Sequence, residues 1–231
     1  MIEFKQVYKS YRELTIFRDI SLTLEDDGIV AVLGDNGSGK TTLLNILCNI
    51  IHPDSGDYFF DGEKITKRSK KFRTRFGAVL SEPIFIDELS VEKYLEFVCD
   101  FQLISGDSVK ERIDFHLNWL NIRDKKNTKI KKISSGEKKK VSIISSLLHQ
   151  PNVLFWDEPF INLDQKSIAK ILNFIGGKNS PNLILIATHN IELLKNIAAK
   201  FIIIEYEDIR IVNNNNAKDF KKVDLGELMQ D

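Results

Sequence analysis

A glycine-rich loop follows directly on the apolar run Ile29–Leu33. From Gly34 to Thr42 it reads Gly-Asp-Asn-Gly-Ser-Gly-Lys-Thr-Thr, which fits the phosphate-binding pattern G-x-x-x-x-G-K-[ST] between a buried strand and an expected helix. Glycines let several backbone N–H groups point into one concavity, and the helix adds partial positive charge at its N-terminus. A glycine-rich helix cap with a chance lysine is the competing interpretation, which the spacing disfavours. The loop therefore predicts a site for the phosphates of a nucleoside triphosphate.

Two residues of this loop have distinct expected roles. Lys40 is long enough to reach the β- and γ-phosphates, and Thr41 offers a hydroxyl to Mg²⁺. The expected contacts to the nucleotide are Gly34, Asp35, Asn36, Gly37, Ser38, Gly39, Lys40, Thr41 and Thr42.

Two adjacent carboxylates end a second apolar run, Val153–Trp156. Charged groups in this position are costly to bury without a partner, and Mg²⁺ bound to a nucleotide is a suitable one. We expect Asp157 to hold Mg²⁺ and Glu158 to orient and deprotonate the attacking water. The alternative is a helix N-terminus with acidic residues and no chemical role. The presence of a phosphate loop favours the catalytic interpretation.

His189 follows a third apolar run, Leu183–Ala187. A lone histidine at a strand end is more often structural than catalytic. Strand ends at one edge of an α/β sheet, however, converge on the ligand crevice, where an imidazole could hydrogen-bond the γ-phosphate. We therefore predict that His189 is a catalytic group together with Lys40 and Glu158.

The elements that must position these residues indicate an α/β fold. The first sixty residues have strand composition, broken by turn signals such as Asp26-Asp27-Gly28. Later apolar runs alternate with helical stretches, and runs that are apolar at every position are typical of parallel strands buried on both faces. Residues 90–121 carry apolar side chains at helical spacing, which predicts a small helical subdomain. The expected strand runs are Ile29–Leu33, Ala78–Leu80, Val153–Trp156, Leu183–Ala187 and Phe201–Ile204.

The composition excludes several classes of function. The 231 residues include 33 Lys and Arg against 33 Asp and Glu, so no global field argues for nucleic acid as a partner. The local basic clusters Lys64–Arg75 and Arg123–Lys140 are either solvated faces or surfaces near anionic lipid headgroups. Cys48 and Cys99 lie in apolar patterns typical of reduced core residues in a cytosolic protein. We expect neither a signal peptide nor a membrane span.

In their order, these motifs resemble the nucleotide-binding subunits of ATP-binding-cassette (ABC) transporters over nearly the whole chain. Gly34–Thr42 resembles the Walker A loop, Val153–Glu158 resembles the Walker B strand, and His189 resembles the switch histidine.

Three further segments carry the resemblance. Ser134-Ser135-Gly136-Glu137 is similar to a degenerate form of the family signature L-S-G-G-Q, in which Ser134 and Gly136 are kept. Asn162-Leu163-Asp164 resembles the D-loop, with Asp164 as the matched acid. Tyr11 stands where the family places an aromatic that stacks on adenine, and the competing interpretation is a surface tyrosine of a strand.

The resemblance implies an architecture and a set of ligands. The architecture is a P-loop NTPase core with a mainly parallel sheet, an antiparallel β lobe and a helical subdomain at about residues 88–135, within one domain of residues 1–231. The ligands are ATP and Mg²⁺, and ATP hydrolysis would power a membrane transporter.

The resemblance also implies partners. Two copies, or this chain and a second cassette, pack head to tail on ATP, so that Ser134 and Gly136 bind the γ-phosphate in trans. Opening and closing of this dimer would act on a transmembrane permease. The chain would then be cytoplasmic and peripheral, at the inner face of the cell membrane.

Ser81 departs from the family pattern, which normally has Gln after the strand that corresponds to Ala78–Leu80. Serine is too short to reach Mg²⁺ across the same gap, so a bridging water or Glu82 must substitute. Some exporter ATPases also lack Gln here, which favours an exporter. The alternative function is a soluble cassette ATPase such as the iron–sulfur assembly ATPase, whose signature also resembles Ser-x-Gly-Glu-Lys-Lys. Pro159 after Glu158 favours the transporters.

Overall fold

The computed structural model describes residues 1–214, except residues 26, 70, 71, 73, 105, 107, 179 and 206. Part of the predicted turn at Asp26, part of the basic cluster Lys64–Arg75 and the end of the predicted domain after residue 214 lie outside the described residues.

The central sheet of the described chain has six strands in the order β10-β9-β3-β8-β7-β6. Pairing is parallel from β9 through β6, and only β10 runs antiparallel to its neighbour β9. The middle strands are buried at nearly every position because both faces of the sheet are covered. The prediction of a mainly parallel sheet is therefore confirmed. The strands are β3 (Gly28–Leu33), β6 (Gly77–Val79), β7 (Val153–Asp157), β8 (Leu183–Ala187), β9 (Lys200–Glu205) and β10 (Asp208–Asn213).

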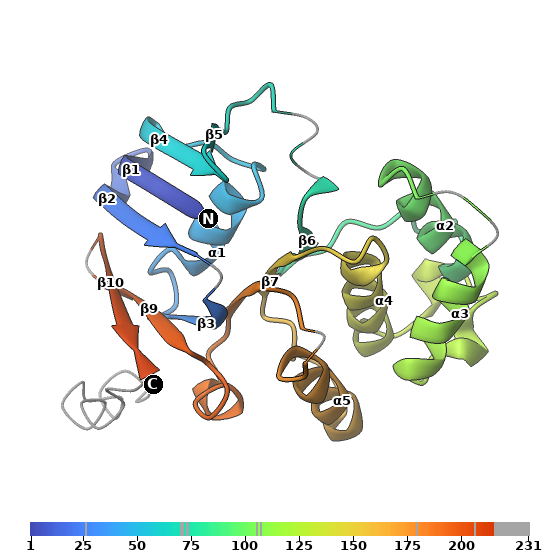
Figure 1. Cartoon of the computed structure of the whole chain (residues 1–231). Helices are drawn as coiled ribbons and strands as arrows, with labels where there is room; N and C mark the ends of the chain where they lie inside the picture. Colours follow the sequence, from blue (N-terminus) through green and yellow to red (C-terminus); the bar gives the residue numbers. More distant parts are fainter. Residues whose placement is uncertain are drawn as a thin grey trace.

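A second sheet, antiparallel and four-stranded among the described residues, has the order β2-β1-β4-β5. Figure 1 shows it on one side of the central sheet, which agrees with the predicted antiparallel β lobe. Its strands are β1 (Ile2–Tyr11), β2 (Leu14–Leu24), β4 (Ser55–Phe60) and β5 (Glu63–Lys64).

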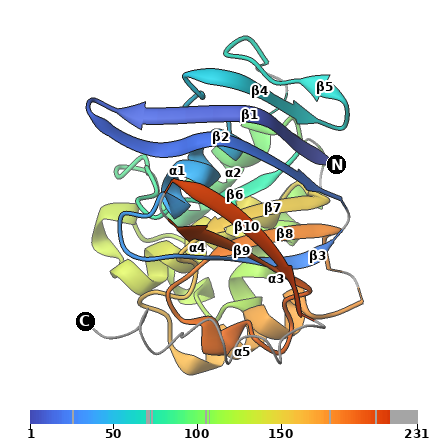
Figure 2. The ribbon, with the colours of Figure 1, turned by 90° about the vertical axis from the view of Figure 1, so that its left-hand side faces the viewer.

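Helix α1 (Lys40–Leu47) lies between the two sheets (Figure 2). Its buried leucines and isoleucine pack in one cluster with apolar residues of the antiparallel sheet and with Val30 and Val32 of β3. The alternate β3 residues, Ile29 and Ala31, belong to a different cluster on the opposite face. This alternation follows from the two-residue period of a strand. It holds α1, and therefore the loop before it, against the carboxyl end of β3.

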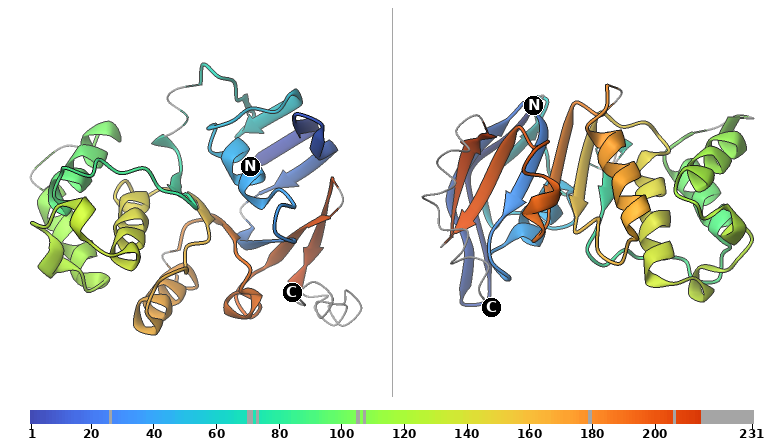
Figure 3. Two further views of the ribbon diagram at one scale, coloured as in Figure 1. Left: turned by 180° about the vertical axis from the view of Figure 1, so that it is seen from behind. Right: turned by 90° about the horizontal axis from the view of Figure 1, so that it is seen from below.

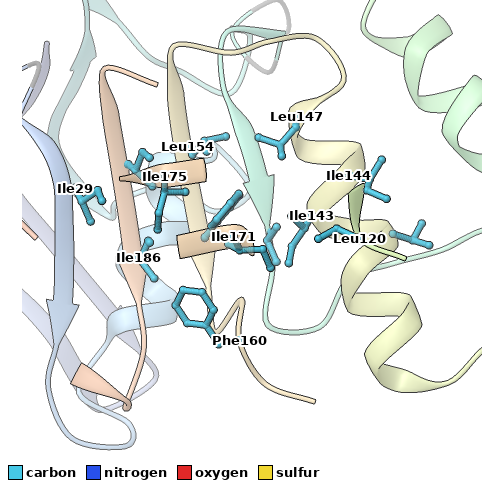
Figure 4. Close-up of a cluster of buried hydrophobic side chains, with 14 of the residues drawn as sticks. Ile29, Leu120, Ile143, Ile144, Leu147, Leu154, Phe160, Ile171, Ile175 and Ile186 are labelled. Carbon is cyan, nitrogen blue, oxygen red and sulfur yellow. The ribbon is translucent and has the colours of Figure 1, made fainter. Parts of the chain in front are cut away.

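The other face of the central sheet is covered by α4 (Ser135–Leu147) and α5 (Gln165–Ile175). In Figure 4 the side chains of Ile171 and Ile175 on α5 pack toward the sheet, as does Ile143 on α4. Beyond α4 lie α2 (Val91–Phe101) and α3 (Ser108–Trp119), on the side away from the antiparallel sheet (Figure 3). Short 3₁₀ turns follow at η2 (Arg123–Lys125), η3 (Ile130–Lys132) and, after β8, η4 (Ile191–Leu193).

Helices α2 and α3 fall in the segment predicted to be helical. The division of the chain into one domain with an inserted helical subdomain stays a prediction. None of the helices in the described part of the chain has both the length and the apolar character needed to cross a membrane.

Candidate nucleotide-binding site

The loop between β3 and α1 takes a backbone path that needs glycine. Gly34 and Gly39 have φ angles of 150° and 112°, which side-chain-bearing residues rarely adopt. A Cβ atom at Gly34 would lie 2.5 Å from Ser38 Oγ and 2.6 Å from the carbonyl of Ile204. A Cβ atom at Gly39 would lie 2.6 Å from a side-chain carbon of Ile16. The loop is therefore packed tightly against Ile204 of β9 and Ile16 of β2.

Lys40 folds back over this loop. Its Nζ donates hydrogen bonds to the carbonyls of Gly34 at 2.6 Å and Asp35 at 2.8 Å. Burial lowers the pKa of Lys40, and the charges of Glu158 and Asp157 raise it. An ammonium has three N–H donors, so one remains for a phosphate oxygen after the two carbonyl contacts.

Two buried oxygens at the site have no hydrogen-bond partner in the described structure, Ser38 Oγ and Glu158 Oε2. Buried polar atoms are nearly always paired with protein, water or ligand. The phosphate oxygens of a nucleotide would satisfy Ser38, and a water molecule would satisfy Glu158. The residues present therefore fit a bound nucleotide.

Asp157 joins three elements at the carboxyl end of β7. Its Oδ2 accepts a hydrogen bond of 2.7 Å from Thr41 Oγ1 on α1, and it also accepts a hydrogen bond from the Ser81 side chain. Burial raises the pKa of Asp157, the hydrogen bond from Thr41 lowers it, and neighbouring Glu158 raises it again. Hydroxyl and carboxylate oxygens are the ligands that Mg²⁺ prefers. Thr41 and Asp157 therefore fit this ion, with Ser81 hydrogen-bonded to Asp157.

Glu158 and His189 are in direct contact. One carboxylate oxygen of Glu158, Oε1, accepts hydrogen bonds from the backbone N–H of His189 at 3.0 Å and from its ring Nδ1 at 2.9 Å. The carboxylate is therefore held through one oxygen, while Oε2 is left without a protein partner. The His189 side chain is 66% exposed, so the ring stays accessible although its Nδ1 is bonded to Glu158.

The predicted signature segment begins α4. Ser134 is the N-cap: its Oγ accepts from the N–H of Glu137 at 3.2 Å, and Glu137 Oε2 accepts from the N–H of Ser134 at 2.7 Å. The hydrogen bond with the Ser134 backbone lowers the pKa of Glu137. A Cβ atom at Gly136 would lie 2.3 Å from the carbonyl of Asn162. The signature segment is thus packed directly against the segment that follows β7.

The remaining predicted site residues make contacts of their own. Asp164 caps α5 through Ser167 and accepts a hydrogen bond of 2.8 Å from Lys140 Nζ. These contacts hold the pKa of Asp164 well below its usual range, with Lys140 as the largest cause. Tyr11 ends β1, is partly exposed, and has Lys9 Nζ 5.3 Å from the centre of its ring.

One charged residue at the site was missed from the sequence. Lys139 belongs to the basic cluster that was expected to be a solvated or lipid-facing surface. This expectation is wrong for Lys139 and for Lys140, because only 6% and 9% of these two residues are exposed. Burial lowers the pKa of Lys139, while the charges of Asp157 and Glu158 raise it. The signal in the sequence that could have predicted this burial is the helical spacing of Lys139 from the apolar residues of α4.

The geometry defines a P-loop nucleotide hydrolase: a phosphate loop, an aspartate bonded to the helix threonine, and a glutamate beside a histidine at one sheet edge. Comparison with known proteins then gives the family. Residues 17–161 match the family model of the ABC transporter. A putative ABC transporter ATP-binding protein of Pyrococcus horikoshii is 30% identical over 97% of this chain and 87% of its own length. The NatA ATP-binding protein of Bacillus subtilis is 28% identical over 83% and 79%.

Solved structures show the same fold. The ATP-binding subunit of an ABC transporter superposes with a TM-score of 0.87, at 21% identity, over 99% of this chain and 97% of that one. An ATP-binding cassette solved as a dimer with ADP and phosphate has a TM-score of 0.83, at 22% identity, over 93% and 99%. The chain belongs to the ABC transporter family, and it is an ATP-binding subunit with ATPase activity.

Proposed function

We propose that this chain hydrolyses Mg²⁺-ATP in a head-to-tail dimer that drives a membrane exporter. The observation that carries the proposal is the state of the Glu158 carboxylate. One oxygen is fixed by His189, and the other is buried without a protein partner beside the carboxylate of Asp157. That arrangement suits a general base that must accept a proton from one water molecule.

The phosphate loop supplies the groups that bind and orient the nucleotide. Lys40 and the hydroxyl of Ser38 contact the phosphates, together with the backbone N–H groups at the start of α1. Thr41 and Asp157, with Ser81 hydrogen-bonded to Asp157, would hold the metal ion. When bound, Mg²⁺ neutralises phosphate charge that would otherwise oppose attack.

Glu158 takes the proton of the attacking water, and His189 holds it in position. Because His189 donates Nδ1–H to the carboxylate, its Nε2 is left to contact a phosphate oxygen or a water. The positioning role of His189 accounts for its two hydrogen bonds to the same oxygen of Glu158, Oε1.

Dimerisation is supported by the start of α4. The Ser134 oxygen accepts from Glu137, so its own hydroxyl hydrogen is still available to a phosphate oxygen of a second molecule. Ser134 is exposed, and the N-terminus of α4 adds partial positive charge. A cassette with the same fold was solved as a dimer. We propose that this chain pairs in the same manner with a second copy of itself, in which Ser134 and Gly136 face the phosphate loop.

The permease would contact a groove of about 450 Å³ between β6, α2 and α4. Ile50, Leu80, Tyr94 and Val98 are among the apolar side chains that line it. Ile84 also lines it and is 88% exposed, which is a large apolar exposure for a surface with no partner. The lining residue Leu80 precedes Ser81, so a segment bound in this groove would act on the residue that hydrogen-bonds Asp157.

This groove would place the chain at the inner face of the membrane, although none of its described helices crosses it. The exporter direction rests on the residue at position 81, since the resembling family normally carries Gln there. Transport assayed in vesicles with the permease tests the direction, and uptake against the gradient in place of efflux would overturn it.

The catalytic part is tested by ATP turnover of Lys40→Ala against wild type. Loss of the lysine leaves phosphate charge uncompensated, so kcat/KM should fall by about 100-fold or more. Lys64→Ala, which removes an exposed lysine of β5, is the matched control and should behave as wild type. Wild-type turnover in Lys40→Ala would remove the phosphate-loop assignment.

A further inference from the structure

Lys139 is buried in the wall of the site, although the proposed chemistry does not use it. Lysine is rarely buried unless a counter-charge lies nearby. The two carboxylates that act on Lys139 are Asp157 and Glu158, one buried and one largely buried. Lys40, on which the same two carboxylates act, already donates to two loop carbonyls. Lys139 is therefore a second cation at the same carboxylate pair.

The packing of α4 on the sheet explains how Lys139 reaches this position. Near the end of α4, Ser146 Oγ accepts a hydrogen bond of 3.1 Å from Trp156 Nε1 of β7. The Ser146 carbonyl passes so close to β6 that a Cβ atom at Gly77 would lie 2.0 Å from it. Gly77 is level with Leu154 in the strand register. The backbone of α4 at Ser146 thus lies close to the level of Leu154, near the beginning of β7, while Trp156 contacts Ser146 through its long side chain. Figure 4 shows Leu147 and Leu154 in this region.

The first turns of α4 then reach the carboxyl end of β7. Lys139 and Ser146 are seven residues apart and share a buried face of the helix, which corresponds to about 10 Å along its axis. Asp157 is three residues beyond Leu154, about 10 Å along the strand. Because α4 returns to β7 through a short connection, helix and strand run in opposite directions. Lys139 therefore lies at the level of Asp157.

We propose that Lys139 is a positioning residue that holds Asp157 and Glu158 as a charged pair in the absence of a divalent cation, and that it thereby sets the Mg²⁺ affinity of the site. The inference rests on the proposed function, because it concerns the same carboxylates. The ammonium and Mg²⁺ act on the same negative charges, so a contact that stabilises the cation-free protein weakens Mg²⁺ binding.

The test compares Lys139→Gln and Lys139→Met with Lys139→Arg, which keeps the charge. Lys138→Gln is the matched control, because it also removes one lysine charge from α4. The Nζ atom of Lys138 lies 3.7 Å from Oδ1 of Asp87. Two quantities are measured for each protein: the Mg²⁺ concentration that gives half-maximal ATP turnover, and the midpoint of thermal unfolding in EDTA and in Mg²⁺ without nucleotide.

The neutral variants should need at least about threefold less Mg²⁺, because the removed ammonium no longer competes with the divalent cation for the same carboxylates. In EDTA their unfolding midpoint should fall below that of wild type, and Mg²⁺ should raise it by more than in wild type. Lys139→Arg and Lys138→Gln should match wild type in both measurements.

Three results would overturn the proposal: an unchanged Mg²⁺ requirement in both neutral variants, an equal change in Lys138→Gln, or neutral variants that do not fold even in Mg²⁺. Failure of wild type to hydrolyse Mg²⁺-ATP would instead overturn the proposed function. The unfolding measurement would still decide the role of Lys139, since it needs no turnover.

Discussion

Asp157 is the residue on which the parts of the site converge. Thr41 reaches it from α1, Ser81 from the end of β6, and Glu158 follows it in the chain. Buried carboxylates need such partners, because an unpaired charge at the end of an apolar strand is strongly destabilising. Because Thr41 and Ser81 both donate to this carboxylate, Asp157 keeps one donor when the Ser81 hydroxyl is lost.

This arrangement gives Ser81 and Asp157 different expected sensitivities. Ser81→Ala should lower the ATPase rate within about tenfold, equivalent to about 1.4 kcal/mol of barrier, because Thr41 still donates to Asp157 and water can fill the gap. Asp157→Ala should abolish turnover, because it removes the carboxylate itself. Steady-state ATP hydrolysis measures both. A loss at Ser81 as severe as at Asp157 would show that the serine binds the metal directly or positions the water.

At the scale of elements, contact between α4 and the segment after β7 links the signature to the Walker B strand. Gly136 packs against the carbonyl of Asn162, and Lys140 of α4 donates to Asp164, the N-cap of α5. Movement of α4 should therefore be passed to α5.

Gly136→Ala tests this packing. The added Cβ atom would lie 2.3 Å from the Asn162 carbonyl, so α4 or the segment must shift, at a cost of about 1–3 kcal/mol of unfolding free energy. Ser135→Ala is the control: this neighbour is exposed, and its change should stay within about 0.5 kcal/mol. Urea unfolding of the two variants gives both values. Equal stabilities would mean that the close approach does not constrain the segment.

The same elements show which parts of the site the sequence could predict. The phosphate loop and the Asp157–Glu158 pair are each formed by consecutive residues at the end of a buried strand. The local sequence pattern was therefore sufficient to predict both. The hydrogen bond from Ser81 to Asp157 depends on β6 pairing beside β7, which are 74 residues or more apart in the chain, and no local pattern encodes that order.

Strand β10 and Lys139 were missed for a related reason. The strand is an edge with mostly exposed positions, so it lacks the continuous apolar run by which the buried strands were found. Lysine is a residue type normally found at the surface, and Lys139 becomes buried only because α4 packs on the sheet.

At the scale of the whole molecule, two histidines away from the site link stability to pH. His149 Nε2 donates to the Phe76 carbonyl, and His116 Nδ1 donates to the Arg112 carbonyl. Burial lowers the pKa of both imidazoles. A lowered folded-state pKa means that the unfolded chain binds protons first as pH falls, so the stability contributed by the neutral rings is present above the unfolded pKa of about 6.5 and lost below it.

The thermal unfolding midpoint of wild type should therefore fall as pH is lowered from about 7.5 through 6.5 to 5.5. His116→Asn with His149→Gln places amide donors near the two ring donors without a titrating group, so its midpoint should fall less over that interval. Above about pH 7.5 the two proteins should follow parallel lines. Identical slopes across the whole range would exclude these histidines as the linked groups.

We propose that ATP joins two copies of this chain until Glu158 allows hydrolysis. Glu158→Gln keeps the shape of the side chain but cannot accept a proton, so it should bind ATP without turning it over. Gel filtration with light scattering should then show a monomer without nucleotide and a dimer in saturating Mg²⁺-ATP. The double variant Lys40→Ala/Glu158→Gln should stay monomeric in both conditions. A Glu158→Gln protein that binds ATP yet remains a monomer would exclude the ATP-dependent dimer.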